Sequence, residues 1–210
     1  MSDNAKVQTI SREVRCPLGY DPSETTRRVP PLQEEAYLLG ALHDGTYNRY
    51  NNRYRFSQKG TSWLKVLRDT FKKIGHGSWI YKEGKNRDVY VLETRASFLD
   101  INFDPVKLSL PEEKRAYIRG FFDAEGGIPH NKNARFYIQL TQKDREKIMK
   151  LKNMLESLNI KTGKIHNPSV RVDPNYWRIF VLASSQLEFA KQINSWHPNK
   201  QKRLEERNMI

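Results

Sequence analysis

Apolar side chains recur at the same intervals in two separate stretches of the chain. The segments SQKGTSWLKVLRDTFKKIG and TQKDREKIMKLKNMLESLN align when Gln58 is placed against Gln142. Their apolar residues then coincide at spacings of three and four, which places them on one face of a helix. The matched apolar pairs are Leu64 with Ile148, Leu67 with Leu151, Phe71 with Leu155 and Ile74 with Leu158. The pattern predicts two equivalent amphipathic helices, and therefore an internal repeat.

The residues that flank each predicted helix have patterns of their own. Ahead of each helix, apolar and polar side chains alternate as in a half-buried strand, in RYRFSQ and in RFYIQLTQ. Each helix ends at a residue that accepts a left-handed conformation, Gly75 or Asn159. Two more strand-like stretches follow, SWIYK and RDVYVL in the first half, VRV and WRIFVL in the second. We expect a short amphipathic helix to close each half.

Together these elements predict the fold class and the domain organisation. With one further helix ahead of each pair of strands, the fold is a mixed α/β (α+β) fold of two pseudosymmetric αββαββα subdomains. Residues 1–30 are polar and show no sustained period, so we expect an extended N-terminal arm. Residues 31–108 are then the first subdomain with its linker, and residues 109–210 the second subdomain with a C-terminal tail.

The helix ahead of each strand pair is rich in small residues and ends in an acid followed by glycine. The two stretches are AYLLGALHDG and AYIRGFFDAEGG. Ala116, Gly120 and Ala124 recur every four positions, and Ala36 and Gly40 have the same spacing. Such stripes let two helix backbones approach closely. We therefore predict a central interface made by these two helices.

Packing of the two stripes would bring Asp44 and Glu125 together, because both helices would end at the same side. Carboxylates are disfavoured at the negative end of a helix dipole, and two of them repel each other. A divalent cation between them removes the conflict, and hard oxygen ligands suit Mg²⁺. A metal held in this way can activate water for phosphodiester hydrolysis. We predict a magnesium site formed by Asp44 and Glu125.

The charge of the chain narrows the choice of partner. Lys and Arg number 37 against 24 Asp and Glu, giving a formal net charge of +13. Such an excess favours nucleic acid, although a basic, well-solvated surface is the alternative. Cys16 is the single cysteine, which excludes a disulfide framework and a cysteine-based zinc site. No apolar run is long enough to span a bilayer and the N-terminus lacks a signal-peptide core, so we expect an intracellular soluble protein.

The stretch IRGFFDAEG resembles the nine-residue signature of the LAGLIDADG homing endonucleases. Gly120, Asp123, Ala124 and Gly126 are identical, and Glu125 stands at the catalytic acidic position of that family. Two motifs in one chain resemble the single-chain, pseudosymmetric members. The resemblance implies saddle-shaped antiparallel sheets in the major groove of double-stranded DNA and Mg²⁺-dependent cutting of both strands at a long site. It also implies that Mn²⁺ can replace Mg²⁺ and that Ca²⁺ supports binding without cleavage.

The first motif is one residue shorter than the second. When Ala36, Tyr37 and Gly40 are aligned with the second motif, Asp44 falls opposite Ala124. Loss of one residue rotates the rest of a helix by about 100°. We expect either a distorted last turn or an altered packing of the two helices.

The resemblance also implies further site residues. Polar side chains at the strand ends would organise water, and basic ones would stabilise phosphate charge. The predicted catalytic residues are Asp44, Glu125, Lys59, Lys143, Gln58 and Gln142, and the predicted metal site comprises Asp44, Gly45, Glu125 and Gly126.

Polar residues on and beside the strands are the candidates for DNA contact. Arg and Gln read guanine and adenine edges in the major groove, although a solvated sheet face has a similar composition. The residues expected to face DNA are Arg49, Arg53, Arg55, Arg87, Arg95, Tyr137, Gln139, Thr141, Arg171 and Arg178. Because Arg55 and Gln139 are equivalent yet different, we expect an asymmetric target bound by a monomer.

Two alternative functions remain compatible with the sequence. A non-catalytic protein of the same fold could act as an RNA-splicing maturase, with RNA as its partner, or as a DNA-binding regulator. The irregular first motif favours this reading, whereas the two retained acids oppose it. A basic structural or ribosome-associated protein would explain the charge but not the repeated acid-ended helices.

Overall fold

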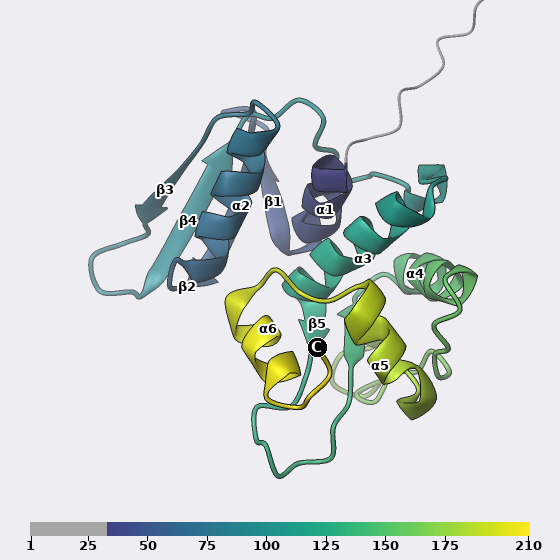
Figure 1. The fold of residues 1–210 in the computed structure, drawn as a ribbon. Helices are drawn as coiled ribbons and strands as arrows, with labels where there is room; N and C mark the ends of the chain where they lie inside the picture. Colours follow the sequence, from purple (N-terminus) through teal and green to yellow (C-terminus); the bar gives the residue numbers. More distant parts are fainter. Residues whose placement is uncertain (1–32) are drawn as a thin grey trace, which may run out of the picture.

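The computed structural model describes residues 33–210 and arranges them as two halves, each with a sheet and helices packed on it (Figure 1). The first half contains α1 (Gln33–Ala41), the 3₁₀ helix η1 (Leu42–Asp44), β1 (Gly45–Asn48), β2 (Arg53–Lys59), α2 (Ser62–Lys73), β3 (Ser78–Lys82) and β4 (Val89–Thr94). The linker holds the 3₁₀ helix η2 (Pro105–Lys107). The second half contains α3 (Pro111–Glu125), β5 (Gly126–Gly127), β6 (Gln139–Gln142), α4 (Arg145–Ser157), β7 (Trp177–Phe180), α5 (Ala183–Gln192) and α6 (Pro198–Glu205). The expected N-terminal arm and Cys16 lie outside the described residues.

Both sheets are antiparallel, and their registers repeat. The strand order is β1-β2-β4-β3 in the first sheet and β5-β6-β7 in the second. Gly45 pairs with Phe56 in the first sheet, and Gly126 pairs with Leu140 in the second. Phe56 and Leu140 are equivalent positions of the sequence repeat, so the repeat holds in three dimensions. The mixed fold with two antiparallel sheets confirms the predicted fold class.

The two amphipathic helices, α2 and α4, form as the apolar spacing predicts. The buried residues of α2 include Leu64, Leu67 and Phe71, and those of α4 include Ile148 and Leu155. Burial of one apolar stripe against the sheet stabilises each helix. The left-handed positions after them are also confirmed, with φ of 80° at Gly75 and 62° at Asn159.

The closing helix expected in the first half is wrong. Between β4 and α3 the chain forms only η2, in which Asp104 Oδ1 accepts the backbone N–H of Val106. Pro105 at the first position favours a short turn that starts there. Longer helices closing a half therefore occur, within residues 33–210, only after β7.

The strand expected at VRV is also wrong. Val170 and Val172 lie in turns and are exposed. Asn167 and Asp173 bond through their side chains to nearby backbone groups, which competes with strand pairing. Instead, two isolated bridges extend the second sheet beside β7, Thr162 with Val181 and His166 with Arg178.

Helices α1 and α3 form the central interface that the small-residue stripes predict, and they lie side by side in Figure 1. A Cβ added at Gly120 would lie well within 3.0 Å of the carbonyl oxygen of Tyr37. A Cβ at Gly40 would meet the carbonyl oxygen of Tyr117 in the same way. The two backbones therefore touch at two equivalent points, and only glycine fits at either. Within residues 33–210, no helix has the length and apolar character needed to cross a membrane.

Candidate functional site

The end of α1 shows how the shorter first motif is accommodated. The α-helix stops at Ala41, and the next three residues form the 3₁₀ helix η1. A 3₁₀ helix rises about 2.0 Å and turns about 120° per residue, against about 1.5 Å and 100° in an α-helix. Three such residues recover roughly the 1.5 Å lost with one missing residue and roughly 60° of the lost rotation. The expected distortion of the last turn is therefore confirmed.

This tightening gives Asp44 the place that Glu125 has in the second half. Each acid directly precedes the glycine that begins a strand, Gly45 in β1 or Gly126 in β5. A Cβ at Gly126 would collide with the ring of Phe122, so glycine is needed where the chain leaves α3. Both glycines, which the resemblance places at the metal site, set the turn that presents the acids.

The two acids are half-buried, and the charge of Asp44 acts on Glu125. Burial raises the pKa of the Asp44 carboxyl, while Gln58 Nε2 donates to Asp44 Oδ2 at 2.5 Å and opposes that shift. Burial, followed by the charge of Asp44, raises the pKa of Glu125. Two half-buried carboxylates at helix C-termini, one of which raises the pKa of the other, fit a shared divalent cation.

The donor set fits a metal that also takes ligands from its substrate. Within residues 33–210, no cluster of three or more His, Cys, Asp or Glu side chains is placed to hold a metal. Two carboxylates with phosphate oxygens and water are the usual environment of Mg²⁺. Asp44 and Glu125 are therefore suited to a cation that completes its shell with a phosphate-containing ligand.

Lys200 of α6 lies at this site, in the part of the chain for which the sequence predicts only a C-terminal tail. Its Nζ donates to the carbonyl oxygens of Phe122, at 2.5 Å, and Asp123, at 2.8 Å, in the last turn of α3. Burial lowers the pKa of Lys200 to about 8, against the opposite effect of Asp123, Glu125 and Asp44. The ammonium thus offsets negative charge at the helix end. No repeat or motif in the sequence marks this lysine.

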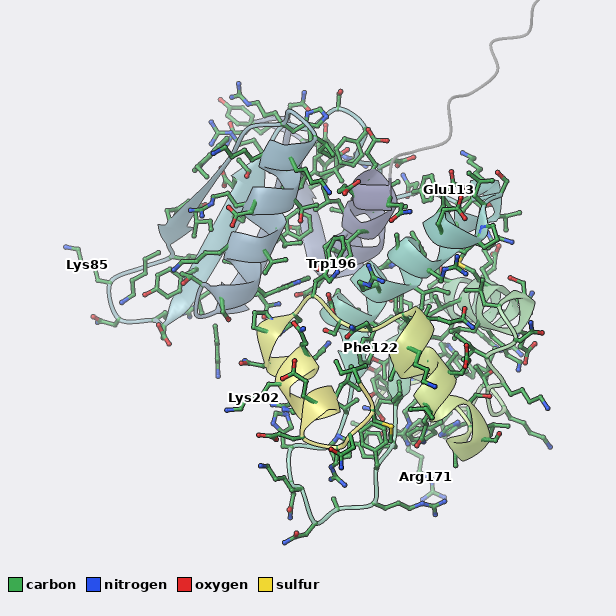
Figure 2. All side chains as sticks on the ribbon, viewed as in Figure 1. Lys85, Glu113, Phe122, Arg171, Trp196 and Lys202 are labelled. Atoms are coloured by element: carbon green, nitrogen blue, oxygen red, sulfur yellow. The ribbon has the colours of Figure 1, made fainter. Side chains whose placement is uncertain are left out.

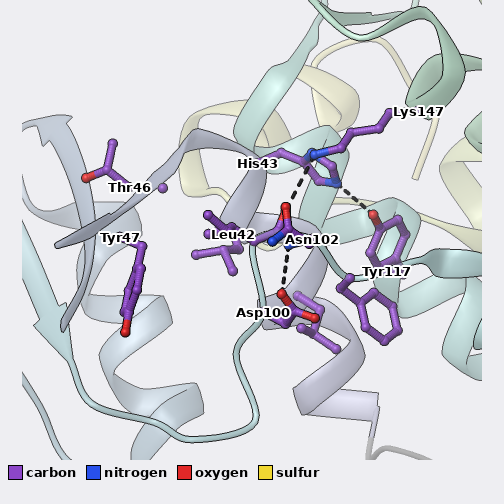
Figure 3. Close-up of a pocket in the computed structure, with 12 residues that line it drawn as sticks. Leu42, His43, Thr46, Tyr47, Asp100, Asn102, Tyr117 and Lys147 are labelled. Carbon is purple, nitrogen blue, oxygen red and sulfur yellow. Dashed lines mark hydrogen bonds between the residues drawn. The ribbon is translucent and has the colours of Figure 1, made fainter. Parts of the chain in front are cut away.

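The two glutamines expected to be equivalent have different partners. Gln58 contacts Asp44, whereas Gln142 Oε1 accepts the backbone N–H of Lys143 at 2.7 Å. That bond orients the Gln142 amide so that Nε2 faces His43 Nδ1 at 3.2 Å. His43 Nε2 then donates to the hydroxyl of Tyr117 at 2.6 Å, as Figure 3 shows.

The hydrogen bonds from Gln142 through His43 to Tyr117 join the two halves of the protein next to Asp44. Burial lowers the pKa of His43 to about 4, so the imidazole is neutral at pH 7, as the bonds from Gln142 and to Tyr117 require. Figure 3 shows His43 on a pocket of about 380 Å³ that Asp100, Asn102 and Lys147 also line.

The two site lysines are exposed at the sheet ends. Lys59 is the last residue of β2, and Lys143 directly follows β6. The charge of Lys143 acts to lower the pKa of Glu125. Among the described residues, no hydrogen bond or ion pair joins Lys59 to Asp44. The charge of Lys143 therefore acts on Glu125, whereas no such effect of Lys59 on Asp44 is resolved, although the two lysines are equivalent in the sequence repeat.

The residues expected to face DNA fall into two groups. Arg53 and Arg55 lie on β2, and Gln139, Thr141 and Arg178 lie on β6 and β7, where Arg178 Nη1 donates to Gln139 Oε1 at 3.4 Å. Thr141 also donates to the carbonyl oxygen of Glu125 at 3.0 Å. The remaining candidates lie on turns or loops, or directly beside a strand: Arg49, Arg87, Arg95, Tyr137 and Arg171, the last pointing outward in Figure 2.

Two acids lie among the arginines of the first sheet, which the sequence reading did not take into account. Glu93 of β4 pairs with Arg53 and Arg55, and Glu83 pairs with Arg55. The register of β2 and β4 places Arg55 directly opposite Glu93. Positive charge on this face is therefore smaller than the five first-half arginines alone indicate.

Asp123, identical in the family signature, is buried and holds the C-terminal segment. Its buried carboxylate accepts the hydroxyl of Tyr37 at 2.9 Å and the hydroxyl of Ser195. It also accepts the backbone N–H groups of Trp196, at 2.9 Å, and His197, at 3.1 Å. The Trp196 ring packs on Tyr37 with ring centroids 4.4 Å apart, at the junction of α1 and α3 (Figure 2). Asp123 therefore fastens residues 195–197 across both halves.

Replacement of Asp123 by Asn is expected to lower the free energy of unfolding by about 3 kcal/mol, because the amide turns one acceptor into a donor that faces other donors. Urea denaturation of the two proteins measures the difference. Asp69→Asn is the matched control, since Asp69 is exposed on α2 and should change stability by no more than about 0.5 kcal/mol. Equal stabilities of the two variants would contradict the role of Asp123.

Comparison with known proteins finds similarity to one family model, one homing endonuclease and several solved structures. Residues 112–194 match the model of the LAGLIDADG-like domain. The homing endonuclease I-ApeI of Aeropyrum pernix is 26% identical over 194 residues, which are 81% of this chain and 85% of that protein.

Solved structures share the fold at lower identity. The crystal structure of I-DmoI in complex with DNA and Mn matches with a TM-score of 0.58 and 19% identity, over 77% of this chain and 96% of that one. Full-length DUF199/WhiA from Thermatoga maritima matches with a TM-score of 0.60 and 18% identity, over 87% of this chain and 64% of that one. Residues 112–194 therefore match the LAGLIDADG-like domain, and the described residues share the fold of the solved structures that they match.

Proposed function

We propose that this protein is a site-specific endonuclease that hydrolyses both strands of double-stranded DNA with a divalent metal held by Asp44 and Glu125. The observation that carries the proposal is the pair of half-buried carboxylates at the ends of η1 and α3, where burial and the charge of Asp44 raise the pKa of Glu125. The names of the relatives support it, since I-ApeI is a homing endonuclease and I-DmoI structures contain DNA with Mn or Ca.

Each residue of the site has a task in this reaction. A bound Mg²⁺ would lower the pKa of water and stabilise the leaving oxygen. Gln58 orients the Asp44 carboxylate, and Lys200 offsets the repulsion between the two acids. Lys143 and Lys59 are exposed and suited to a phosphate. Mn²⁺ is expected to support cutting, and Ca²⁺ to support binding alone.

The two sheets carry different side chains at equivalent positions, so we expect the DNA target to be asymmetric. Arg55 on β2 corresponds to Gln139 on β6, and arginine favours guanine whereas glutamine favours adenine. Both halves belong to one chain, so a monomer contains both acids. Half-sites of unlike sequence are therefore expected.

A DNA-binding regulator that does not cut is the second candidate. The match to full-length DUF199/WhiA is compatible with it, because that protein shares the fold and its name gives no endonuclease activity. A regulator that does not cut DNA would have no use for the acid pair and its neighbouring lysines.

Cutting of a randomised DNA library distinguishes the two functions. The purified protein is incubated with double-stranded DNA, with and without Mg²⁺, and the new ends are sequenced. An endonuclease yields discrete, Mg²⁺-dependent cuts within one long motif. Selective binding without new ends would contradict the endonuclease proposal and favour the regulator.

Replacement of Lys200 by Met is expected to lower several-fold the Ca²⁺ concentration that half-saturates the DNA complex, because a cation that opposes the metal is removed. Titration of Ca²⁺ against DNA retention measures the change. Lys202→Met is the control, since Lys202 is exposed on the same helix (Figure 2). A half-saturating Ca²⁺ concentration that is unchanged or higher in the Lys200 variant would contradict the placement of this charge.

A further inference from the structure

A buried acid lies on the face of the first sheet that carries Arg53 and Arg55. A surface that binds DNA would be expected to carry only basic side chains there. Glu93 of β4 is 7% exposed. The register places it beside Arg55 of β2 and Trp79 of β3, so all three side chains share one face. An acid that is buried on the open face of a sheet must be covered by its own partners.

Two arginines and a tyrosine provide that cover. Arg53 Nη1 donates to Glu93 Oε2 at 2.9 Å, and Arg55 Nε lies 3.2 Å from Oε1. Tyr81 donates to Oε1 at 2.8 Å, and Arg55 Nη2 donates to Tyr81 at 3.2 Å. Burial alone would raise the pKa of Glu93, but the hydrogen bonds from Tyr81 and Arg53 outweigh it and lower the pKa. Glu93 is therefore charged at pH 7.

The network fixes the direction of both guanidinium groups without using all of their donors. Among residues 33–210, Nη2 of Arg53 and Nη1 of Arg55 have no hydrogen-bond partner. The Arg53 guanidinium also lies 5.0 Å from the Trp79 ring centroid. Free donors on a side chain that is already oriented lose less conformational freedom when they bind a ligand.

The equivalent positions of the second half carry no such network. Gln139 takes the place of Arg55, and the register puts Phe180 of β7 opposite it, where the first half has Glu93. Phe180 packs against Tyr137 and Arg178 instead. Orientation of arginines by an acid is thus a property of the first half.

We propose that Glu93 is a specificity-determining residue that orients Arg53 and Arg55 to read guanines in the half of the target bound by the first sheet. The proposal rests on the DNA-binding function proposed above. Arginine forms a bidentate pair with O6 and N7 of guanine, which requires a fixed direction of its fork. Glu93 touches the arginines rather than the base, so its role is to position them.

The test separates orientation from charge. Wild-type protein and Glu93→Gln are each used to select bound sequences from randomised double-stranded DNA in Ca²⁺. Glu93→Gln removes one negative charge, so its affinity for non-specific DNA should rise several-fold at low salt. Its preference for guanine, at one or two positions of a single half-site, should fall about 10-fold or more.

Two further variants keep the result interpretable. Asp88→Asn removes one negative charge from the turn between β3 and β4, so it should raise non-specific affinity and keep the guanine preference. Arg55→Lys keeps the charge and loses the fork, so it should lose the guanine preference at one position even if Glu93→Gln fails to fold.

The possible failures have different meanings. A Glu93→Gln protein that folds and selects the same sequences as the wild type would overturn the role of Glu93 and leave the proposed function intact. Unchanged guanine preference in Arg55→Lys would also overturn it. Absence of sequence-selective DNA binding by the wild type would overturn this inference together with the proposed function.

Discussion

Replacement of Glu125 by Gln is expected to slow DNA cutting at least about 10³-fold and to leave DNA affinity equal or higher. The amide keeps the size of the side chain but is a poor ligand for a divalent cation, and a metal that stabilises the reacting oxygens lowers the barrier by several kcal/mol. Removal of one negative charge beside the phosphates should not weaken binding. Single-turnover cutting of a mapped target measures the loss.

Asp44→Asn should have the same effect on both strands, because the charge of Asp44 acts on Glu125 and the two acids are proposed to share metal. A different label on each strand of the target DNA allows the two cuts to be followed separately. Asp69→Asn, far from the acids on α2, serves as the control and should cut at the wild-type rate. A variant of either acid that still cut one strand at the wild-type rate would contradict a shared centre.

Replacement of Gly120 by Ala is expected to lower the free energy of unfolding by about 3 kcal/mol or more, because the added methyl would overlap the backbone of α1. Besides the carbonyl oxygen of Tyr37, the new Cβ would lie 2.7 Å from the backbone nitrogen of Ala41. Neither atom can move without moving α1, so the two helices must separate. Urea denaturation measures the loss.

Gly77→Ala is the matched control for this change. No atom lies within 4 Å of a Cβ placed at Gly77, which has no left-handed φ. Alanine there should leave the free energy of unfolding unchanged or raise it by about 0.4–1 kcal/mol, because it lowers the conformational entropy of the unfolded chain. Equal stability of the Gly120 and Gly77 variants would show that α1 and α3 are not in close contact.

Features that depend on local spacing could be predicted from the sequence. The apolar stripes of α2 and α4 recur at helical intervals, and burial of one face is what such a stripe requires. The small residues Gly40 and Gly120 likewise predict a close helix pair, since few other residues permit backbone contact.

Features that depend on long-range contacts could not be predicted in this way. Lys200 and Ser195 belong to a C-terminal segment with no counterpart in the first half, so the repeat gives no hint of their partners. The charge on the open sheet required the strand register, because Glu93 and Arg55 lie on different strands. The 3₁₀ turn before Asp44 was foreseen only as a distortion, since the missing residue did not specify which geometry replaces it.

Location of the metal is the most direct test of the proposed site. Crystals of the complete protein with its target DNA are soaked with Mn²⁺, and anomalous diffraction then marks each bound ion without reference to activity. We expect a peak coordinated by the carboxylates of Asp44 and Glu125 and by a phosphate oxygen of the DNA. Mn²⁺ bound to the DNA or elsewhere on the protein, with both carboxylates free of metal, would contradict the site.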